Sequence, residues 1–498
     1  MNKIESNYLK AINGMETQTE YKNKYSSTSN TTMPNRELVI FNQQKSNQLL
    51  VKTSTAKERI KKLKKLKAFI QQNETLVVEA LKTDLRKNSF EGSAFELYTV
   101  YSEIDFAIKN LSVWMEPVRV PSNLVNILTK SYIHYEAKGL CLIIAPWNYP
   151  FLLLISPLVS AIAAGNCCIL KPSELAPTTS NAIAKIIGEV FKENEIAVIE
   201  GDVSVSTTLL ELPFNHIFFT GSTRIGKVVM SAAAKHLATV TLELGGKSPT
   251  IVDTDVNLKK VAHKIVWGKF SNAGQTCIAP DYVFVHESQA EKLIVHLKEV
   301  IEQFYYKNNS LNTDDYCKII SANHYNRLKG LLDDSVKKGA KIKIGGQFDD
   351  AIQTIHPTVI TNVNDEVLIM QEEIFGPILP IITYTDKQEA IDYINAHDKP
   401  LALYIFSKSN RTINHIIKNT SAGGTCVNDV LIHISNPNLS FGGINTSGMG
   451  GSHGFHGFKS FSHERSIMHQ SKWFDLGSIG YPPYKGKQLI LKILRKIM

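Results

Sequence analysis

The sequence predicts an α/β protein with two successive regions of alternating strands and helices. Three observations support this fold class. From about residue 138, short apolar runs alternate with helical stretches, the connections between them are short, and a second alternating region extends from 242 to about 426. Strands that alternate with helices in this way form a parallel, doubly wound sheet covered on both faces. Two α/β regions in one chain usually enclose a cleft, where ligands bind.

Length and composition agree with this fold class. The chain has 498 residues, 43% apolar and 20% charged, which is enough to bury a large core and excludes a wholly disordered protein. At about 150 residues per domain, this length suggests roughly three domains.

The first region contains eight expected elements. We expect strands at 140–145, 167–171, 197–200 and 216–220, and helices at 151–164, 178–192, 204–212 and 226–236. The run 151–164 is the longest internal apolar stretch, and it is too short to span a bilayer. We therefore interpret it as a buried helix beside the sheet.

The second region contains six expected elements. We expect strands at 250–252, 281–285 and 378–383, and helices at 258–270, 287–304 and 387–394. Parallel sheets bind their ligands beyond the carboxyl ends of the strands, so candidate residues are sought there.

The two ends of the chain differ in character. Residues 1–35 are polar, and we expect a flexible extension without a secretory signal, with one short helix near 8–12. Residues 488–498 form a basic amphipathic segment that is too short to span a bilayer. This segment could cover an active-site entrance, its own or a partner's, or lie on an anionic membrane surface, and the two roles are compatible. Either role suits a lipophilic substrate.

Charge and cysteine content exclude several function classes. A net charge of +9 on a chain of this length is weak evidence for nucleic acid, and we expect no nucleic-acid partner. Part of the excess lies in 57–67, whose apolar spacing indicates an amphipathic helix with a solvated basic face. The six cysteines include no Cys-x-x-Cys pair, so we expect no metal site and a reducing, cytoplasmic compartment.

Two segments are candidates for binding a nucleotide. In 218–226, a strand leads to Gly221 and Ser222, and Gly226 is expected to open a helix whose free N–H groups face a diphosphate. A tight strand-to-helix turn is the alternative. Lys171 and Glu174 stand at the end of another strand, where both side chains could reach ribose hydroxyls. A surface ion pair between the two is the alternative.

Three residues could carry covalent chemistry on a carbonyl group. Cys277 ends a loop of small residues, which suits a nucleophilic thiolate, although an inert buried cysteine fits the same pattern. Glu243 lies among apolar neighbours, which would raise its pKa and suit a general base. A structural ion pair is the alternative role for this carboxylate. Asn148 lies between two prolines and could donate to an oxyanion or to its own backbone.

An acid and an aromatic ring stand two residues apart just before an expected strand. These are Glu373 and Phe375. If the segment is extended, the two side chains lie on one face.

These motifs together resemble the aldehyde dehydrogenase superfamily. The shared motifs are Glu-Leu-Gly-Gly-Lys-Ser-Pro at 243–249, Gly-Gln-Thr-Cys at 274–277, Pro-Trp-Asn at 146–148, Gly-Ser-Thr-x-x-Gly at 221–226 and Glu-Glu-Ile-Phe-Gly-Pro at 372–377. They occur in the family's order, and Cys277 follows Glu243 by 34 residues, as in the family. The resemblance covers about 45–485. Within the superfamily, the sequence most resembles the class 3, fatty-aldehyde type. Within this type it resembles the bacterial members, one of which is associated with carotenoid aldehydes.

The resemblance implies an architecture with a small β arm. It predicts a flexible extension at 1–35, an NAD-binding domain of Rossmann type, an α/β catalytic domain, an oligomerisation arm that joins two subunits into a homodimer, and a C-terminal extension. The expected bounds are 36–119 and 138–242 for the NAD-binding domain, 243–427 for the catalytic domain, 120–137 and 428–470 for the arm, and 471–498 for the extension. At 440–453 the sequence departs from the family pattern near the interface and the substrate entrance, which leaves the shape of the substrate open.

The resemblance also implies a role for each candidate residue. NAD, with NADP as the alternative, would lie along the sheet edge, and Glu174 favours NAD. Cys277 would attack an aldehyde, the oxyanion would be held by Asn148, and after hydride transfer Glu243 would activate water to hydrolyse the thioester. Lys171 and Glu174 would bind the adenosine ribose, and Gly221, Ser222 and Gly226 would lie by the pyrophosphate. Glu373 would bind the nicotinamide ribose, and Phe375 would pack nearby. Tyr98 and Trp267 would line the substrate tunnel.

The last two assignments and the reaction each leave an alternative. Tyr98 and Trp267 could equally be packing residues. A coenzyme A-acylating dehydrogenase and a non-enzymatic protein on the same scaffold are the competing functions; Glu243 argues against the first, and the intact set of Cys277, Glu243 and Asn148 against the second.

Overall fold

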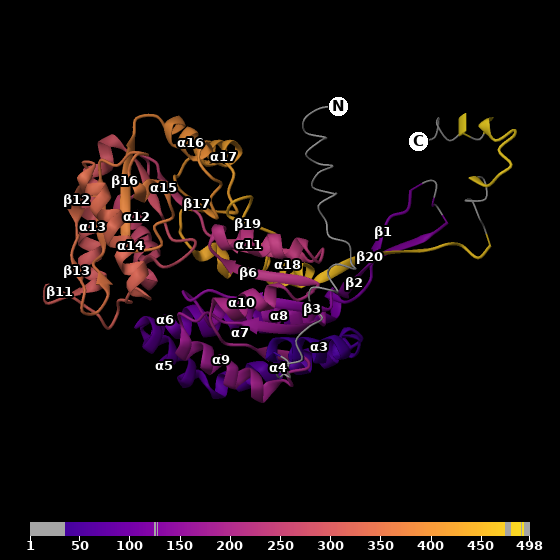
Figure 1. Cartoon of the computed structure of the whole chain (residues 1–498). Coiled ribbons are helices and arrows are strands. Elements are labelled where there is room, and N and C mark those ends of the chain that lie inside the picture. Colours follow the sequence, from indigo (N-terminus) through magenta and orange to yellow (C-terminus); the bar gives the residue numbers. More distant parts are fainter. Residues whose placement is uncertain (1–34, 124–125, 127, 474–479, 490, 493–498) are drawn as a thin grey trace, which may run out of the picture.

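The computed structural model describes residues 35–123, 126, 128–473, 480–489, 491 and 492. The helix expected near 8–12 and most of the apolar residues of the C-terminal segment lie outside the described residues. Figure 1 shows two α/β bodies side by side, with a narrow arm projecting from the first.

The first body is a six-stranded sheet among the described residues, in the order β19-β7-β6-β3-β4-β5. All neighbouring strands are parallel except β19, which is antiparallel to β7. The strands are β3 (Leu140–Ile144), β4 (Cys167–Lys171), β5 (Ile196–Val198), β6 (His216–Gly221), β7 (Thr239–Leu244) and β19 (Gly448–Met449). The predicted parallel sheet is therefore confirmed, and the four predicted strands agree within a few residues.

Helices cover both faces of this sheet. One core contains α4, α7, α8 and α9, and the other contains α3, α10 and α11. Successive strand residues point to opposite cores, since Cys168 and Leu170 belong to the first and Cys167 and Ile169 to the second. The helices are α3 (Arg36–Lys52), α4 (Ala56–Gln72), α5 (Glu74–Leu85), α6 (Ser89–Glu91), a π-helix (Gly92–Leu97), α7 (Tyr98–Trp114), α8 (Leu152–Ala164), α9 (Pro177–Val190), α10 (Val203–Leu210) and α11 (Thr223–Ala234).

The basic amphipathic helix expected at 57–67 is α4. Its apolar residues Leu63, Leu66 and Ile70 are fully buried, and its lysines lie on the other side. Thr55 and Glu58 form a capping box that fixes its first turn.

The second body is a seven-stranded sheet in the described chain, in the order β12-β15-β16-β9-β8-β17-β18. It is parallel except for β12, and a single large core surrounds it. Its strands are β8 (Pro249–Val252), β9 (Tyr282–His286), β12 (Lys341–Ile344), β15 (Thr358–Thr361), β16 (Ile378–Tyr384), β17 (Ala402–Phe406) and β18 (Gly424–Val427).

Its helices and short elements complete the second body. The helices are α12 (Leu258–Phe270), α13 (Ala290–Tyr305), α14 (Ala322–Lys337), α15 (Leu368–Gln371), α16 (Lys387–Ala396) and α17 (Asn410–Asn419). The 3-10 turns are Ser271–Gly274, Glu287–Gln289 and Ile432–Ser435, and the short strands are β10 (Tyr306–Lys307), β11 (Ser310–Leu311), β13 (Phe348–Asp349) and β14 (Thr354–Ile355). All six elements predicted for this region are present, with boundaries shifted by a few residues.

The arm is a three-stranded antiparallel sheet in the order β1-β2-β20. Its strands are β1 (Val118–Val120), β2 (Lys130–Ala137) and β20 (Ser462–His469). Only β20 of the range 428–470 joins this sheet. Other parts of that range pack on the first body, since β19 pairs with β7 and α18 (Gly454–Ser460) contacts α7 and α8. Val430 and Phe441 belong to the core of the second body.

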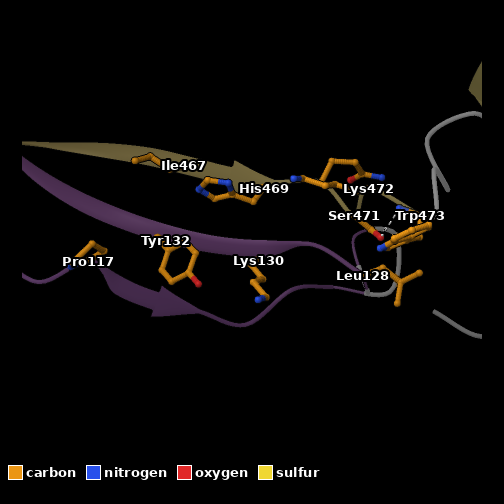
Figure 2. A pocket seen from close by; sticks show the side chains of 10 residues that line it. Pro117, Leu128, Lys130, Tyr132, Ile467, His469, Ser471, Lys472 and Trp473 are labelled. Atoms are coloured by element: carbon orange, nitrogen blue, oxygen red, sulfur yellow. Dashed lines mark hydrogen bonds between the residues drawn. The ribbon is translucent and has the colours of Figure 1, made fainter.

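A hollow of about 650 Å³ opens at the outer end of the arm. Figure 2 shows residues of β2, β20 and the segment after β20 around it. Its lining includes Leu128, Lys130, Tyr132, His469, Lys472 and Trp473. No helix in the described parts of the chain is long and apolar enough to cross a membrane.

A fully buried ion pair joins the N-terminal helices to the first sheet. Lys87 Nζ lies 2.6 Å from Glu96 Oε1, and neither side chain is exposed to solvent. The other carboxylate oxygen, Glu96 Oε2, accepts from the backbone N–H groups of Phe151 and Leu152 at the start of α8. This pair therefore fixes the π-helix against the N-terminus of α8.

Loss of Lys87 should destabilise the protein strongly. Lys87→Ala would leave the buried Glu96 carboxylate without its counter-ion, which typically costs about 3–5 kcal/mol. Lys67→Ala removes a partly exposed pair with Asp105 and should cost less than about 1 kcal/mol. Urea unfolding followed by tryptophan fluorescence measures both changes, and equal losses in the two variants would contradict the role of the buried pair.

Candidate active site

The loop before Cys277 is a buried, irregular turn at the end of α12. Asn272, Ala273 and Gly274 have φ values of 51°, 51° and 72°, so three consecutive residues adopt the left-handed conformation. This reverses the chain directly after the helix. A side chain at Gly274 would collide with the carbonyl oxygen of Gly376, so only glycine fits there.

Side-chain amides satisfy the backbone of this loop. Asn272 Nδ2 donates to the carbonyl oxygens of Asn148, at 2.9 Å, and Gln275, at 3.1 Å. Gln275 Nε2 donates to the carbonyls of Asn272 and Lys318, and Gln275 Oε1 accepts from the N–H of Ile320. Because buried backbone groups must be paired, these contacts hold the loop before Cys277 in one conformation.

Asn148 follows β3 and reaches this loop from the first body. Its side-chain Nδ2 donates to the carbonyl of Gln275 at 3.0 Å, and the residue is 2% exposed. Lys87 Nζ donates to its backbone oxygen at 3.1 Å, so the buried ion pair also holds this turn. The structure therefore brings Asn148 to the Cys277 loop. Its amide bonds that loop and not its own backbone.

Glu243 lies at the end of β7, beside the antiparallel partner Gly448. Its side chain is buried, and neither carboxylate oxygen has a hydrogen-bond partner among the described residues. Burial raises the pKa of Glu243 to about 8, and the nearby Ser452 hydroxyl opposes this shift. The ion pair considered as an alternative for Glu243 is absent from the described part of the chain.

The Cys277 thiol is surrounded by acids. Burial, and then the negative charges of Glu373 and Glu243, raise the pKa of Cys277 to about 12. The thiol is therefore protonated at neutral pH in this state, and its activation requires a base or a nearby positive charge.

Glu373 lies against the turn between β7 and β8. Its carboxylate occupies the space where a side chain of Gly245 would stand, so that position requires glycine. Burial, and then the charge of Asp281, raise the pKa of Glu373 to about 8.

Phe375 lies close by but not in an extended segment. Its φ is 50°, and its ring packs edge-on against Trp147 with centroids 5.4 Å apart. The argument that placed Glu373 and Phe375 on one face of an extended segment is therefore wrong, because a left-handed residue breaks the alternation.

The candidate nucleotide residues lie at the carboxyl ends of β4 and β6. Lys171 Nζ is buried, donates to the carbonyl of Pro172 at 2.7 Å and lies 3.6 Å from Glu174 Oε2. Glu174 is about 41% exposed and can turn toward a ligand. Gly221 ends β6, and Ser222 caps α11 by accepting from the N–H of Ile225.

Gly226 does not open the helix, as the sequence had suggested. The helix α11 starts at Thr223, and Gly226 lies within its first turn. A Cβ at Gly226 would lie 2.7 Å from a methyl carbon of Leu244 on β7. Glycine is therefore required here so that the helix can pack closely on the sheet, and Ser222 provides the helix start.

The structure separates the two residues predicted for the substrate tunnel. Trp267, near the end of α12, is partly buried, and its ring lies 6.2 Å from that of Phe95 in the π-helix. Tyr98 is 60% exposed and packs on Tyr101 instead. Phe95 lies within the π-helix, whereas Tyr98 is the first residue of α7. Phe95 is the aromatic ring that the sequence had not singled out.

Comparison with known proteins identifies the family. The aldehyde dehydrogenase family model matches residues 37–467. The chain belongs to the aldehyde dehydrogenase family. It is 46% identical to "Putative aldehyde dehydrogenase AldX" of Bacillus subtilis, over 87% of this chain and 97% of the relative. It is 45% identical to "4,4'-diaponeurosporen-aldehyde dehydrogenase" of Staphylococcus aureus, over 88% of this chain and 94% of the relative.

A solved structure and a mammalian relative support the same family assignment. The structure described as "Substrate bound state of Staphylococcus Aureus AldH" has a TM-score of 0.89 and 43% identity, and the match covers 93% of this chain and 100% of that chain. "Aldehyde dehydrogenase family 3 member A2" of Macaca fascicularis is 43% identical over 85% of this chain and 87% of the relative. The predicted class 3 resemblance, the aldehyde dehydrogenase fold and an NAD(P)-linked aldehyde-oxidising enzyme are thus confirmed.

Alkylation should report the protonation state of the Cys277 thiol. In the unliganded protein, the rate of reaction of Cys277 with iodoacetamide should be low at pH 7 and rise about tenfold per pH unit through pH 9, because only the thiolate reacts. Glu373→Gln removes a neighbouring negative charge, so it should lower the thiol pKa and raise the rate at pH 8. Mass spectrometry measures the labelling.

The control for this experiment is Cys277→Ser. The other five cysteines are buried, so labelling in this variant should be near background. Labelling of Cys277 at a rate independent of pH between 7 and 9 would contradict the raised pKa.

Proposed function

We propose that the protein oxidises lipophilic aldehydes to carboxylic acids in the cytoplasm, with Cys277 as the nucleophile. The convergence of Cys277, Glu243, Glu373 and the Asn148 amide from two separate bodies supports this proposal most directly. Each of these groups has the chemistry that one step of the reaction needs.

The residues at the sheet edge fit a nicotinamide dinucleotide. The start of α11 offers free N–H groups next to Gly221 and Ser222, which suits a diphosphate. Lys171 and Glu174 offer a cation and an acceptor for the adenosine ribose, and the Glu373 carboxylate suits the second ribose. When bound, the nicotinamide supplies the hydride acceptor for the oxidation.

The protein's own groups stabilise the first tetrahedral adduct. The Cys277 thiol first transfers its proton to water, and the thiolate Sγ then attacks the aldehyde carbon, so that the carbonyl oxygen takes the negative charge. The oxyanion is held by the Cys277 backbone N–H and by Asn148 Nδ2, which has a second hydrogen free after bonding Gln275. Such a donor typically contributes about 3–4 kcal/mol to the barrier.

The second half of the reaction belongs to Glu243. After hydride transfer leaves a thioester on Cys277, Glu243 removes a proton from water, and the carboxylic acid is released. A pKa of about 8 keeps this group close to half ionised in mildly alkaline solution, which suits a general base. Neither Glu243 carboxylate oxygen is bonded to another group among the described residues, so either one can accept a hydrogen bond from the attacking water.

Substrate size, assembly and location are proposed on separate grounds. The aromatic pair of Trp267 and Phe95 and the basic C-terminal segment 488–498 suit a long, apolar aldehyde, of fatty, aromatic or carotenoid type. The projecting arm suits pairing of two subunits as a homodimer, and 488–498 suits peripheral contact with the inner membrane surface. The S. aureus relative named for a diaponeurosporen aldehyde supports a lipophilic substrate.

Replacement of the base should separate the two halves of the reaction. Glu243→Gln should release one equivalent of NADH per active site and then stop, because the thioester is not hydrolysed. In the wild type, the hydrolysis rate should rise with pH up to about 8, as the carboxyl group ionises. Stopped-flow absorbance and intact-mass measurement of the acyl-enzyme check this.

Cys277→Ala is the matched control, and it should give no burst while still binding NAD. Unchanged steady-state turnover of Glu243→Gln at pH 7 would require another base.

The dependence of the reaction rate on aldehyde length should test whether the C-terminal segment helps to bind lipophilic substrates. Rates for aldehydes from three carbons to long polyenes should show kcat/KM rising with length, because each buried methylene adds about 0.8 kcal/mol. Removal of 488–498 should lower kcat/KM for long substrates only, and more so when vesicles of anionic lipid are present. Equal losses for short and long aldehydes would contradict a role in handling lipophilic substrates.

A further inference from the structure

We propose that the nucleotide edge selects NAD over NADP, and that Glu200 and Asp202 act with Glu174 as specificity-determining residues. This inference rests on the proposed function and names the form of the cofactor. Glu200 and Asp202 belong to none of the motifs singled out in the sequence. Their place in the fold puts them beside the group that would hold the adenosine ribose.

The sheet brings the three carboxylates to one edge. β4 and β5 are parallel neighbours, with Leu170 opposite Val198 and the N–H of Ile199 bonded to Leu170. Lys171, the last residue of β4, is therefore level with Ile199. Glu200 follows directly, and Asp202 caps α10 by accepting from the N–H of Ser204 at 2.9 Å. Both carboxylates thus lie at the carboxyl end of the sheet, where the ligand would bind.

The only cation among these groups is already balanced. Lys171 is buried, bonds the carbonyl of Pro172 and lies 3.6 Å from Glu174. Its ammonium group is also attracted by Asp202 and Glu200, which partly offset the effect of burial on its pKa. Conversely, the bonds from Ser204 and the charge of Lys171 lower the pKa of Asp202, so Asp202 is ionised at neutral pH. One positive and three negative charges therefore surround this position.

This arrangement treats a hydroxyl and a phosphate differently. A ribose 2′-OH can donate a hydrogen bond to a carboxylate such as Glu174, which is about 41% exposed. A 2′-phosphate carries about two negative charges at neutral pH, cannot donate as a dianion and is repelled by a site of net negative charge. We expect NADP to bind at least about 100-fold more weakly than NAD.

Direct binding provides the first test. Isothermal titration of the full-length protein with NAD and with NADP, without aldehyde, gives both dissociation constants. Because Glu200 and Asp202 are exposed, salt should screen the repulsion, so affinity for NADP should increase between 0.02 and about 0.5 M NaCl relative to that for NAD. This readout does not depend on turnover.

The second test removes charge without changing shape. In the double variant E200Q/D202N, the amide oxygen introduced by D202N can still accept from the N–H of Ser204, so the cap on α10 and the fold should be preserved. We expect NADP to bind about tenfold more tightly, NAD to change less than about twofold, and the salt dependence of NADP binding to weaken. E189Q is the control, because it removes one exposed carboxylate near the C-terminal end of α9, at the opposite end of the sheet. It should change neither constant.

The outcomes separate this inference from the function it rests on. Equal affinities for NAD and NADP in the wild type, or an unchanged ratio in E200Q/D202N with a native melting temperature, would overturn the selectivity assigned to these carboxylates. Failure of both dinucleotides to bind would instead overturn the proposed function. Loss of NAD affinity in E200Q/D202N equal to the gain for NADP would show that the two residues bind the ribose without discriminating between its forms, and would also overturn the inference.

Discussion

The candidate active site depends on hydrogen bonds that satisfy a buried, irregular stretch of backbone. The Cys277 loop leaves α12 through three left-handed residues and cannot form the regular bonds of a helix or strand. The side-chain amides of Asn148, Asn272 and Gln275 supply these bonds instead. One of them, Asn148, comes from the other body. The contact that holds the Cys277 loop in place is therefore also one of the contacts that join the two bodies.

Exclusion of water from this centre has an electrostatic consequence. Burial raises the pKa of Cys277, Glu243 and Glu373 together, and each acid raises that of the thiol through its charge. The three groups cannot all ionise at once at neutral pH, because each negative charge disfavours the next. A neutral thiol in the resting protein and a carboxyl that ionises near pH 8 are both results of the same desolvation.

Close approach of backbone segments shapes the region between the sheets. β7 ends at Leu244, and two glycines lead into β8. A side chain at Gly245 would displace the Glu373 carboxylate, and one at Gly246 would lie 3.2 Å from the backbone of Leu401. Glycine at Gly226 likewise lets α11 pack on Leu244. Packing therefore explains why glycine stands at these three positions, whereas Gly221 is the last residue of β6.

The sequence alone determined the alternation of strands and helices and the family, because periodicity and short motifs are local properties of a chain. It also named Cys277, Glu243, Asn148, Lys171 and Glu373 as candidates for the site. The tertiary structure decided what depends on residues far apart in sequence. The buried pair of Lys87 and Glu96 looks like surface charge in the sequence, Phe95 and not Tyr98 meets Trp267, and Phe375 turns in a left-handed conformation. Burial and side-chain direction arise from contacts between distant segments, and no local pattern contains them.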